Sequence, residues 1–330
     1  MNRCLGYAEA LTNLGFKCLF YGNYDDGAQA IITDSSLMFE LTEPIGVPDW
    51  VSRTPVHLSG QVLLDSYNIS ASDVSIINEK MNLVKFVLID DFYKLDYYHC
   101  DAIINFTIGA NDMLTEARTC EGLFGDIEPQ LFLGPNYYPA RGWLRSVRKM
   151  RPQTAVTEVE KILIVTGGRD NSGTTIKLLE LLYKVKKESE VAVLLVNDEE
   201  SNNIIDNYLN KFSKSYMFVH QPNLGDWYNW ADVCLCGGGL IKYECLFVGL
   251  PVVSLSQTAE QQIDSSKHKE LGLICDLGMN TDVDATVMEQ KLGEFINDVN
   301  YRQYVIDKGR TVIGGENNSI MVEPFITNTV

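Results

Sequence analysis

Three consecutive glycines, Gly237 to Gly239, form the segment of this sequence whose residue types best suit the binding of an anion. An apolar run from Val233 to Cys236 precedes them and predicts a buried strand, and Leu240 to Val248 has the apolar spacing of a helix. Glycines between a strand and a helix let backbone N–H groups approach an anion, which the positive end of the helix dipole also attracts. The alternative is a tight turn, but three glycines lose more backbone entropy than a turn requires. We therefore expect a phosphate site at Gly238, Gly239 and Leu240.

Glu244 follows about one turn into the predicted helix, where its carboxylate can accept hydrogen bonds from ribose hydroxyls. The alternative is a glutamate on the surface. A second glycine-bearing loop, Thr166 to Thr175, follows the predicted strand Lys161 to Val165 and contains Gly168, a further candidate nucleotide contact. The sequence lacks both the GxGxxG fingerprint after its first strand and the Walker lysine motif, which argues against a dehydrogenase or a P-loop enzyme.

Strands and helices alternate along the chain, which predicts an α/β fold with parallel sheets. Polar residues follow several predicted strands, at the edge where open α/β sheets bind ligands. These residues are Asp65, Tyr67, Asp90, Asp91 and Asn105. The alternative for the aspartates is that they cap helices or turns. Residues 22–58 have an ambiguous pattern, which we interpret as one short helix or strand with loops.

A basic segment, Arg141 to Pro152, and a polar stretch, Thr154 to Glu158, separate the two halves of this pattern. We expect a short linker here, between an N-terminal Rossmann-like domain of residues 1–150 and a C-terminal Rossmann-like nucleotide-binding domain of residues 157–330. The chain opens with helical spacing from Asn2 to Leu14, whereas a doubly wound domain opens with a strand. The first strand of the N-terminal domain is therefore expected to be missing.

The 330 residues carry a formal net charge of -17, which argues against binding to nucleic acid or to an anionic membrane surface. No apolar run reaches the roughly 18 residues that a membrane span needs. The eight cysteines form no CxxC pair and no zinc spacing, so we expect neither a metal site nor a cofactor. Reduced, mostly buried thiols and the polar start of the chain predict a cytoplasmic protein.

The motifs, taken in order, resemble a known family: the UDP-sugar hydrolase of pseudaminic acid biosynthesis and the related spore-coat polysaccharide biosynthesis proteins. Both look like glycosyltransferases of the GT-B class. The resemblance covers nearly the whole chain. The residues that carry it are Arg3-Cys4, Asp65-Ser66-Tyr67, Leu88-Ile89-Asp90-Asp91, Cys100-Asp101 with Asn105, Leu133-Gly134-Pro135-Asn136-Tyr137, Gly167-Gly168-Arg169-Asp170, Gly237-Gly238-Gly239 with Glu244, and Gly249-Leu250-Pro251.

The resemblance implies a GT-B fold, in which two Rossmann-like domains have parallel sheets that face a central cleft and the second domain holds UDP. It places the diphosphate on the backbone of the glycine loop and the ribose on Glu244. Substrate contacts are implied for Arg3, Tyr67, Gln261 and Gln262. Gln261 stands where the family segment has an asparagine.

Family members carry a Gly-His-x-x-Arg-Cys pattern whose histidine is the expected catalytic base. Here that histidine would precede Met1, so Asp65 and Asp90 are the candidate bases within the chain. The main hypothesis is a nucleotide-sugar hydrolase that releases UDP from a UDP-sugar in polysaccharide or pseudaminic acid biosynthesis. The alternatives are a GT-B glycosyltransferase with a UDP-sugar donor and a catalytically silent nucleotide-sugar-binding protein. The oligomeric state is not predicted.

Overall fold

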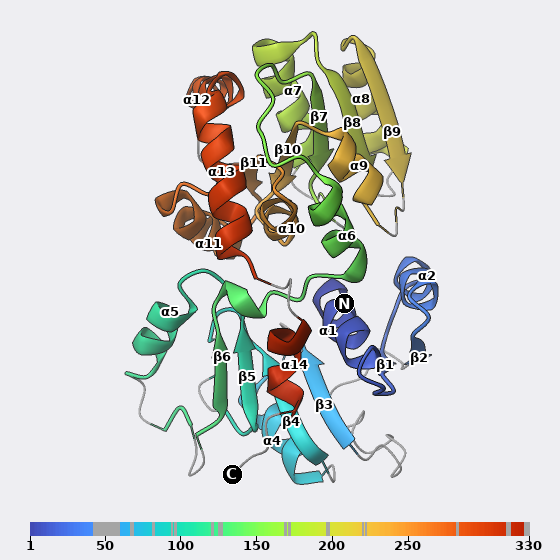
Figure 1. The fold of residues 1–330 in the computed structure, drawn as a ribbon, viewed down its shortest axis with the longest axis vertical. Coiled ribbons are helices and arrows are strands. Elements are labelled where there is room, and N and C mark those ends of the chain that lie inside the picture. The colour runs from blue at the N-terminus through green and yellow to red at the C-terminus, as the bar shows by residue number, and fades with distance from the viewer. Residues whose placement is uncertain are drawn as a thin grey trace. The chain divides into compact units, whose positions relative to one another are not determined.

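The computed structural model divides the chain into two compact units, which we describe separately (Figure 1). The first unit consists of Met1–Arg141 together with Gly314–Val330, and the second is Gly142–Ile313. The described residues are 1–41, 60–66, 69–80, 83–93, 95, 98–119, 122–124, 128–167, 170, 173–195, 199–219, 221, 223–281, 284–314 and 318–326.

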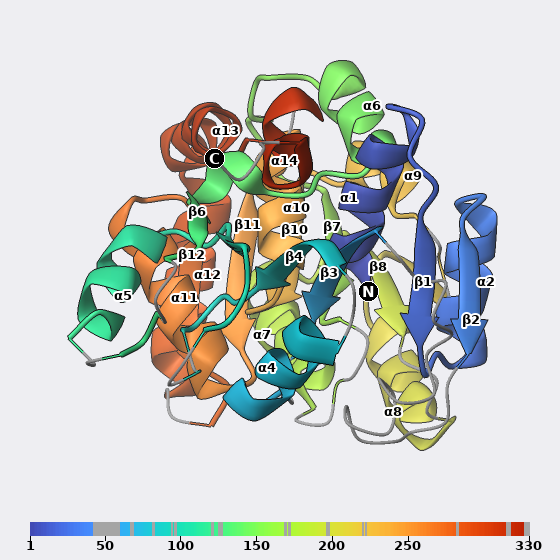
Figure 2. The ribbon, with the colours of Figure 1, turned by 90° about the horizontal axis from the view of Figure 1, so that it is seen from below.

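The first unit contains two parallel sheets. Strands β3, β4, β5 and β6 form one sheet in that order (Figure 1), and β1 pairs only with β2 among the described strands (Figure 2). The core of the larger sheet includes the fully buried Phe86 and Ile103. The elements are α1 (Asn2–Thr12), β1 (Leu19–Gly22), α2 (Asp26–Asp34), β2 (Met38–Leu41), β3 (Gly60–Asp65), α4 (Ala71–Lys80), β4 (Leu83–Ile89), β5 (Ala102–Asn105), α5 (Ala110–Ala117), β6 (Gln130–Leu133), the short 3-10 helix η1 (Pro135–Tyr137) and α14 (Asn318–Ile326).

The second unit is built on one parallel sheet of order β12-β11-β10-β7-β8-β9. From β7 the chain adds β8 and β9 toward one edge of the sheet, and from β10 it adds β11 and β12 toward the other edge. Because crossovers between parallel strands are right-handed, α7 and α8 lie on one face of the sheet, and α10 and α11 lie on the opposite face. The elements are α6 (Gly142–Met150), β7 (Lys161–Val165), α7 (Thr174–Lys186), β8 (Glu190–Leu195), α8 (Glu199–Leu209), β9 (Lys214–Val219), α9 (Gly225–Trp230), β10 (Val233–Gly237), α10 (Ile241–Val248), β11 (Val252–Ser256), α11 (Ala259–Glu270), β12 (Cys275–Met279), α12 (Ala285–Asn297) and α13 (Val299–Val312).

The α/β architecture with parallel sheets confirms the predicted fold class. The strand expected before Met1 lies outside the sequence and stays a prediction. In the ambiguous stretch 22–58, the described part forms α2 and β2, and 42–59 lie outside the described residues. None of the described helices is both long and apolar enough to cross a bilayer.

The two units differ from the expected ranges 1–150 and 157–330 at two places. Helix α6 belongs to the second unit, because the buried Arg148 and Arg151 bind backbone carbonyls there. The chain also returns to the first unit at Gly314, whose N–H donates to the carbonyl of Pro135 at 2.9 Å. Helix α14 then packs on α1, as Figure 1 and Figure 2 both show. The boundary thus falls within the basic segment, between Arg141 and Gly142, and the rest of that segment belongs to the second unit.

Candidate functional site

The glycine loop lies at the point in the second sheet where the strand order reverses. Strands β7 and β10 are parallel neighbours, and Val165 is paired with Cys236 near their carboxyl ends. The loop that begins at Thr166 and the loop Gly237 to Gly239 therefore leave the sheet at the same edge. Open α/β sheets bind ligands at such a switch point, outside the carboxyl ends of the strands.

Gly237 and Gly238 are glycines for reasons of internal packing. A Cβ atom added at Gly237 would lie 2.8 Å from the carbonyl oxygen of Thr166, and one at Gly238 would lie 2.6 Å from Oγ of Ser256 and 2.7 Å from Cβ of Gln261. Real Cβ atoms do not approach other atoms so closely. These two positions hold the loop against the sheet, whatever it binds.

Gly239 is different, because a Cβ atom added there would meet only the Nε2 atom of Gln261, at 3.9 Å. The φ angle of Gly239 is not positive either, so the backbone does not demand a glycine. Neither packing nor conformation within the described residues explains this glycine. Close approach of a ligand to the backbone is the remaining physical reason for it.

Helix α10 begins beside this open position without a side-chain cap. Leu240 occupies the N-cap position and makes no side-chain hydrogen bond to the first turn. The first N–H groups of a helix have no partners inside the helix, and the helix dipole makes this end positive. The structure thus brings the predicted residues Gly238, Gly239 and Leu240 together in an arrangement that suits an anion.

Glu244 lies in the first turns of α10 and is 9% exposed. Its Oε2 atom accepts a hydrogen bond of 2.6 Å from the hydroxyl of Tyr228, which is fully buried. Burial and then the charge of Glu244 raise the pKa of Tyr228 well above its ordinary value, so the phenol keeps its proton and donates. This bond fixes the carboxylate of Glu244. The ribose contact stays a prediction.

The two predicted glutamines on α11 point to different places. The Oε1 atom of Gln261 accepts from the N–H of Gln257 at 2.9 Å, and its Nε2 atom would lie 3.9 Å from a Cβ atom added at Gly239. Gln262 instead donates to Oδ2 of Asp276 on β12, at 2.9 Å. Gln261 is thus placed beside the glycine loop, whereas Gln262 is tied to the neighbouring strand. The candidate residues Gly168 and Tyr67 lie outside the described residues.

Arg3 ties the start of α1 to the ends of β3 and β4. It is 5% exposed, and its Nε and Nη2 atoms donate to the two carboxylate oxygens of Asp65 at 2.9 and 2.5 Å, while its Nη1 atom pairs with Asp91. Burial alone would raise the pKa of Asp65, but the hydrogen bonds and charge of Arg3 outweigh it and hold this pKa below its ordinary value. A carboxylate so paired is a weakened base.

Asp90, the other candidate base, is held by uncharged groups. Its Oδ1 atom accepts from the N–H groups of Phe92 and Tyr93 at 3.0 and 2.9 Å, and its Oδ2 atom accepts from the hydroxyl of Tyr98. These contacts match the turn-capping alternative. The roles of Arg3, Asp65 and Asp90 with a substrate stay predictions. Among the described residues, no group of histidine, cysteine and carboxylate side chains could hold a metal ion.

Sequence comparison relates the chain to two curated proteins, and no family model matches it. Spore coat polysaccharide biosynthesis protein SpsG of Bacillus subtilis is 21% identical over 243 residues, which are 70% of this chain and 66% of SpsG. The uncharacterized protein MJ1062 of Methanocaldococcus jannaschii is 25% identical over 205 residues, which are 61% of this chain and 41% of that protein. The matches thus span less than two thirds of either relative.

Structure comparison finds the same architecture along nearly the entire chain. The UDP-GlcNAc 2-epimerase of Neisseria meningitidis bound to UDP-GlcNAc has a TM-score of 0.61 at 12% identity, with 99% of this chain and 97% of that one covered. TcCGT1 in complex with UDP has a TM-score of 0.63 at 11% identity, with 98% and 95% covered. A glycosyltransferase of Rickettsia africae has a TM-score of 0.60 at 13% identity, with 99% and 95% covered. The chain has the GT-B fold and is similar in sequence to SpsG.

The resemblance predicted from the ordered motifs is thereby confirmed at the level of fold and of SpsG-like sequence. Sequence reasoning missed two residues that support the candidate site, Tyr228 and Lys242. A lysine in the run from Leu240 to Val248, whose remaining residues are apolar or aromatic apart from Glu244, was an available signal. Lys242 is fully buried beside the glycine loop.

Proposed function

We propose that this chain binds UDP or a UDP-sugar at the glycine loop of its second unit and acts on a UDP-sugar in polysaccharide or nonulosonic acid biosynthesis. The observation that carries the proposal is Gly239, an open glycine at the uncapped start of α10 and at the switch point of the sheet. The similarity to SpsG supports the pathway class, and the solved relatives with bound UDP or UDP-GlcNAc support the ligand.

The reaction we propose is hydrolysis, on the strength of the motifs shared with the UDP-sugar hydrolase. Water attacks the anomeric carbon, the glycosidic bond to the diphosphate breaks, and UDP leaves. The charge that develops on the leaving diphosphate is stabilised by the N–H groups at the start of α10. Of the two candidate bases in the chain, Asp90 is preferred, because Arg3 lowers the basicity of Asp65.

Transfer of the sugar to an acceptor hydroxyl is the second candidate, and the likeness to the Rickettsia africae glycosyltransferase favours it. UDP release from UDP-sugars, measured with and without acceptor alcohols, separates the two reactions. Release without an acceptor supports the hydrolase, and release only with an acceptor supports the transferase. Tight UDP binding with no release in either case identifies a silent binding protein.

Binding itself is tested by calorimetry with UDP, ADP and GDP. Gly239→Ala should weaken UDP binding about tenfold or more, because the methyl group occupies the space into which a phosphate must come. Gly293→Ala on α12 is the matched control, since its added Cβ atom makes only an ordinary contact of 3.6 Å with Val185 on α7. Absence of UDP binding by the unmodified chain, or equal binding of the three nucleotides, contradicts the proposal.

The choice of base is tested separately from binding. Asp90→Asn should slow UDP release about 10²–10⁴-fold, as loss of a general base does, while UDP affinity stays unchanged. Asp112→Asn, on an exposed position of α5, controls for the loss of one carboxylate. If Asp90→Asn retains full turnover, Asp90 only caps its turn, and the base lies elsewhere.

A further inference from the structure

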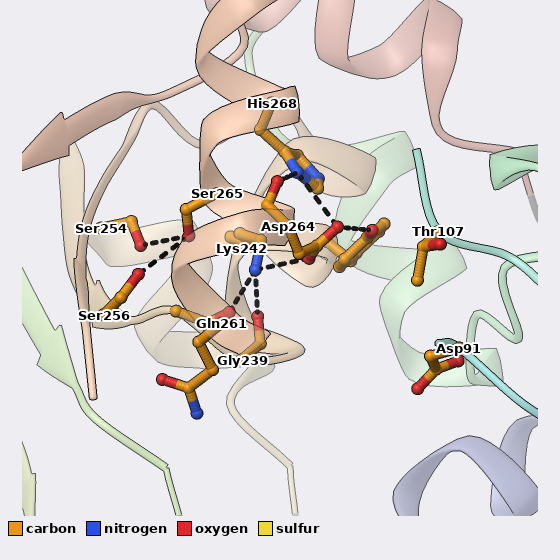
Figure 3. Close-up of polar contacts among 12 residues, drawn as sticks. Asp91, Thr107, Gly239, Lys242, Ser254, Ser256, Gln261, Asp264, Ser265 and His268 are labelled. Carbon is orange, nitrogen blue, oxygen red and sulfur yellow. Dashed lines mark hydrogen bonds and ion pairs between the residues drawn. The ribbon is translucent and has the colours of Figure 1, made fainter. Parts of the chain in front are cut away.

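A lysine is fully buried at the positive end of helix α10. The Nζ atom of Lys242 donates to the carbonyl oxygens of Gly238 and Gly239, the latter at 3.4 Å, and lies 2.7 Å from Oδ2 of Asp264 (Figure 3). A cation near a helix N-terminus is repelled by the helix dipole, and a buried charge loses its hydration. This position is therefore unfavourable for a lysine unless its contacts compensate.

Asp264 on the neighbouring helix α11 supplies the compensating charge. Its Oδ1 atom accepts from the hydroxyl of Tyr243 at 2.9 Å, so both of its oxygens are engaged. The buried His268 contacts the carbonyl of Asp264 through Nδ1 at 2.8 Å, and burial lowers the pKa of His268 to about 4. At neutral pH the imidazole is uncharged, and one cation therefore faces one anion in this cluster, which Figure 3 shows.

The direction of the two glycine carbonyls fixes the direction of the N–H groups that follow them. In a planar trans peptide the C=O and the N–H point in opposite directions. Because the carbonyls of Gly238 and Gly239 face the buried Lys242, the N–H groups of Gly239 and Leu240 point away from it. These are two of the groups expected to bind the diphosphate, and Gly239 is the position with open space beside it.

We propose that Lys242, held by Asp264, is a positioning residue that aims the N–H groups of Gly239 and Leu240 at the diphosphate of the nucleotide. The inference rests on the proposed function, since it assigns a task within the same site. Lys242 acts from behind the loop through hydrogen bonds to its carbonyls, and it does not touch the ligand. Its role is to make the site selective for the diphosphate part of UDP over the nucleoside part.

The test uses the double variant Lys242→Met with Asp264→Asn. Removing the lysine alone leaves a buried carboxylate uncompensated and risks unfolding, whereas the double change removes both charges and keeps an oxygen for the hydroxyl of Tyr243. Lys291→Met is the matched control, because Lys291 also donates to a backbone carbonyl, that of Asp276 at 3.2 Å. UDP and inorganic pyrophosphate are measured by calorimetry, and uridine by ligand-detected NMR.

The double variant should lose about tenfold or more in affinity for UDP and pyrophosphate, because two charge-assisted hydrogen bonds to phosphate lose their alignment. Its uridine affinity should stay within about twofold of the unmodified chain. The backbone ¹⁵N order parameters of Gly239 and Leu240 in the ligand-free protein should also fall, because the carbonyls of Gly238 and Gly239 lose the hydrogen bonds from Lys242. The Lys291→Met control should bind all three ligands unchanged.

Two results overturn the inference: unchanged UDP affinity in the double variant, or a parallel loss of UDP and uridine affinity, which marks a merely structural role. Failure of the unmodified chain to bind UDP overturns the proposed function instead. In that case the order parameters still decide whether Lys242 holds the loop, since they require no ligand. Unchanged order parameters at Gly239 and Leu240 refute the role of Lys242 in either case.

Discussion

The two ends of helix α10 both bring side-chain cations to backbone carbonyls, but with opposite electrostatic results. At the C-terminal end, Arg148 donates to the carbonyl of Phe247 and Arg151 to that of Gly249, at 3.1 Å for the latter. These cations complement the negative end of the helix dipole and satisfy carbonyls that the helix leaves without partners. At the N-terminal end, the cation of Lys242 opposes the dipole and requires Asp264 beside it.

The difference teaches which end is arranged for stability and which for a ligand. Arg148 and Arg151 improve the fold on their own, and Arg310 adds a third guanidinium on the carbonyl of Val248 at 3.1 Å. Lys242 and Asp264 form a pair of the kind that apolar side chains can replace without loss of stability. Because such a pair adds little stability, its presence is better explained by the orientation that it gives to the N–H groups of the glycine loop.

The largest expected effect is at the C-terminal end, where Arg151→Met breaks the carbonyl-binding cluster. Arg151 is 9% exposed and donates to the carbonyls of Gly249, Tyr228 and Ala231. Leaving three buried carbonyls without donors should lower the free energy of unfolding by about 4 kcal/mol. Urea unfolding measures it, with Lys149→Met on an exposed position of α6 as control. Equal, small losses in both variants would falsify the assigned role.

These arginines also show what the sequence could and could not predict. The strand, glycine loop and helix from Val233 to Val248 were predictable, because apolar spacing and glycine position are local signals. Arg148 and Arg151 were expected in a linker, because their partners lie about 80 to 100 residues away and leave no local pattern. The return of α14 to the first unit is missed for the same reason.

The candidate site was predictable only in part. The type and spacing of Gly239 and Glu244 identified the loop before any contact was known, whereas the burial of Lys242 depends on Asp264 of another helix. The difference between Gly238 and Gly239 was also hidden, since it depends on Ser256 at the end of the adjacent strand. Residue type reveals which groups can bind a ligand, and packing decides which of them face it.

The second largest effect is a loss of stability in acid through His268, behind the N-terminal end of α10. Burial lowers the pKa of His268 from 6.5 to about 4 in the folded chain. Between these values the unfolded chain binds the proton and the folded chain does not, so stability falls as the pH drops from about 6.5 towards 4 and then levels off. The total is roughly 3 kcal/mol. Urea unfolding across this pH range should show a flatter profile for His268→Gln, and identical profiles would refute the assignment.

Gly238→Ala and Gly239→Ala separate packing from binding at the N-terminal end. The added methyl group at Gly238 would lie 2.6 Å from Oγ of Ser256 and should cost about 2 kcal/mol of stability. At Gly239 the space is open, and stability should change by less than about 1 kcal/mol while UDP affinity falls. Thermal unfolding and calorimetry on both variants check this. A stability loss at Gly239 as large as that at Gly238 would show that the two glycines do not differ.

The smallest expected effect concerns Tyr228, which has hydrogen bonds to residues at both ends of helix α10. Its carbonyl accepts from Arg151 at the C-terminal end, and its hydroxyl donates to Glu244, the predicted ribose contact. Tyr228→Phe keeps the carbonyl and the ring, so only the hydroxyl bond of 2.6 Å is lost. UDP affinity should fall by about 1 kcal/mol, because the carboxylate is no longer held in one orientation.

The affinity for 2′-deoxy-UDP sharpens this prediction, since that ligand lacks one of the ribose hydroxyls. If Glu244 binds this hydroxyl, 2′-deoxy-UDP should bind the unmodified chain less well than UDP does, and Tyr228→Phe should narrow the difference. Trp143→Phe is a control, because its ring packs 5.9 Å from that of Tyr228 without a bond to Glu244. An unchanged ratio of the two affinities in Tyr228→Phe would mean that Glu244 serves only to satisfy the buried phenol. The ribose would then be bound by other groups, and the nucleotide-binding role of α10 would be confined to the backbone N–H groups at its start.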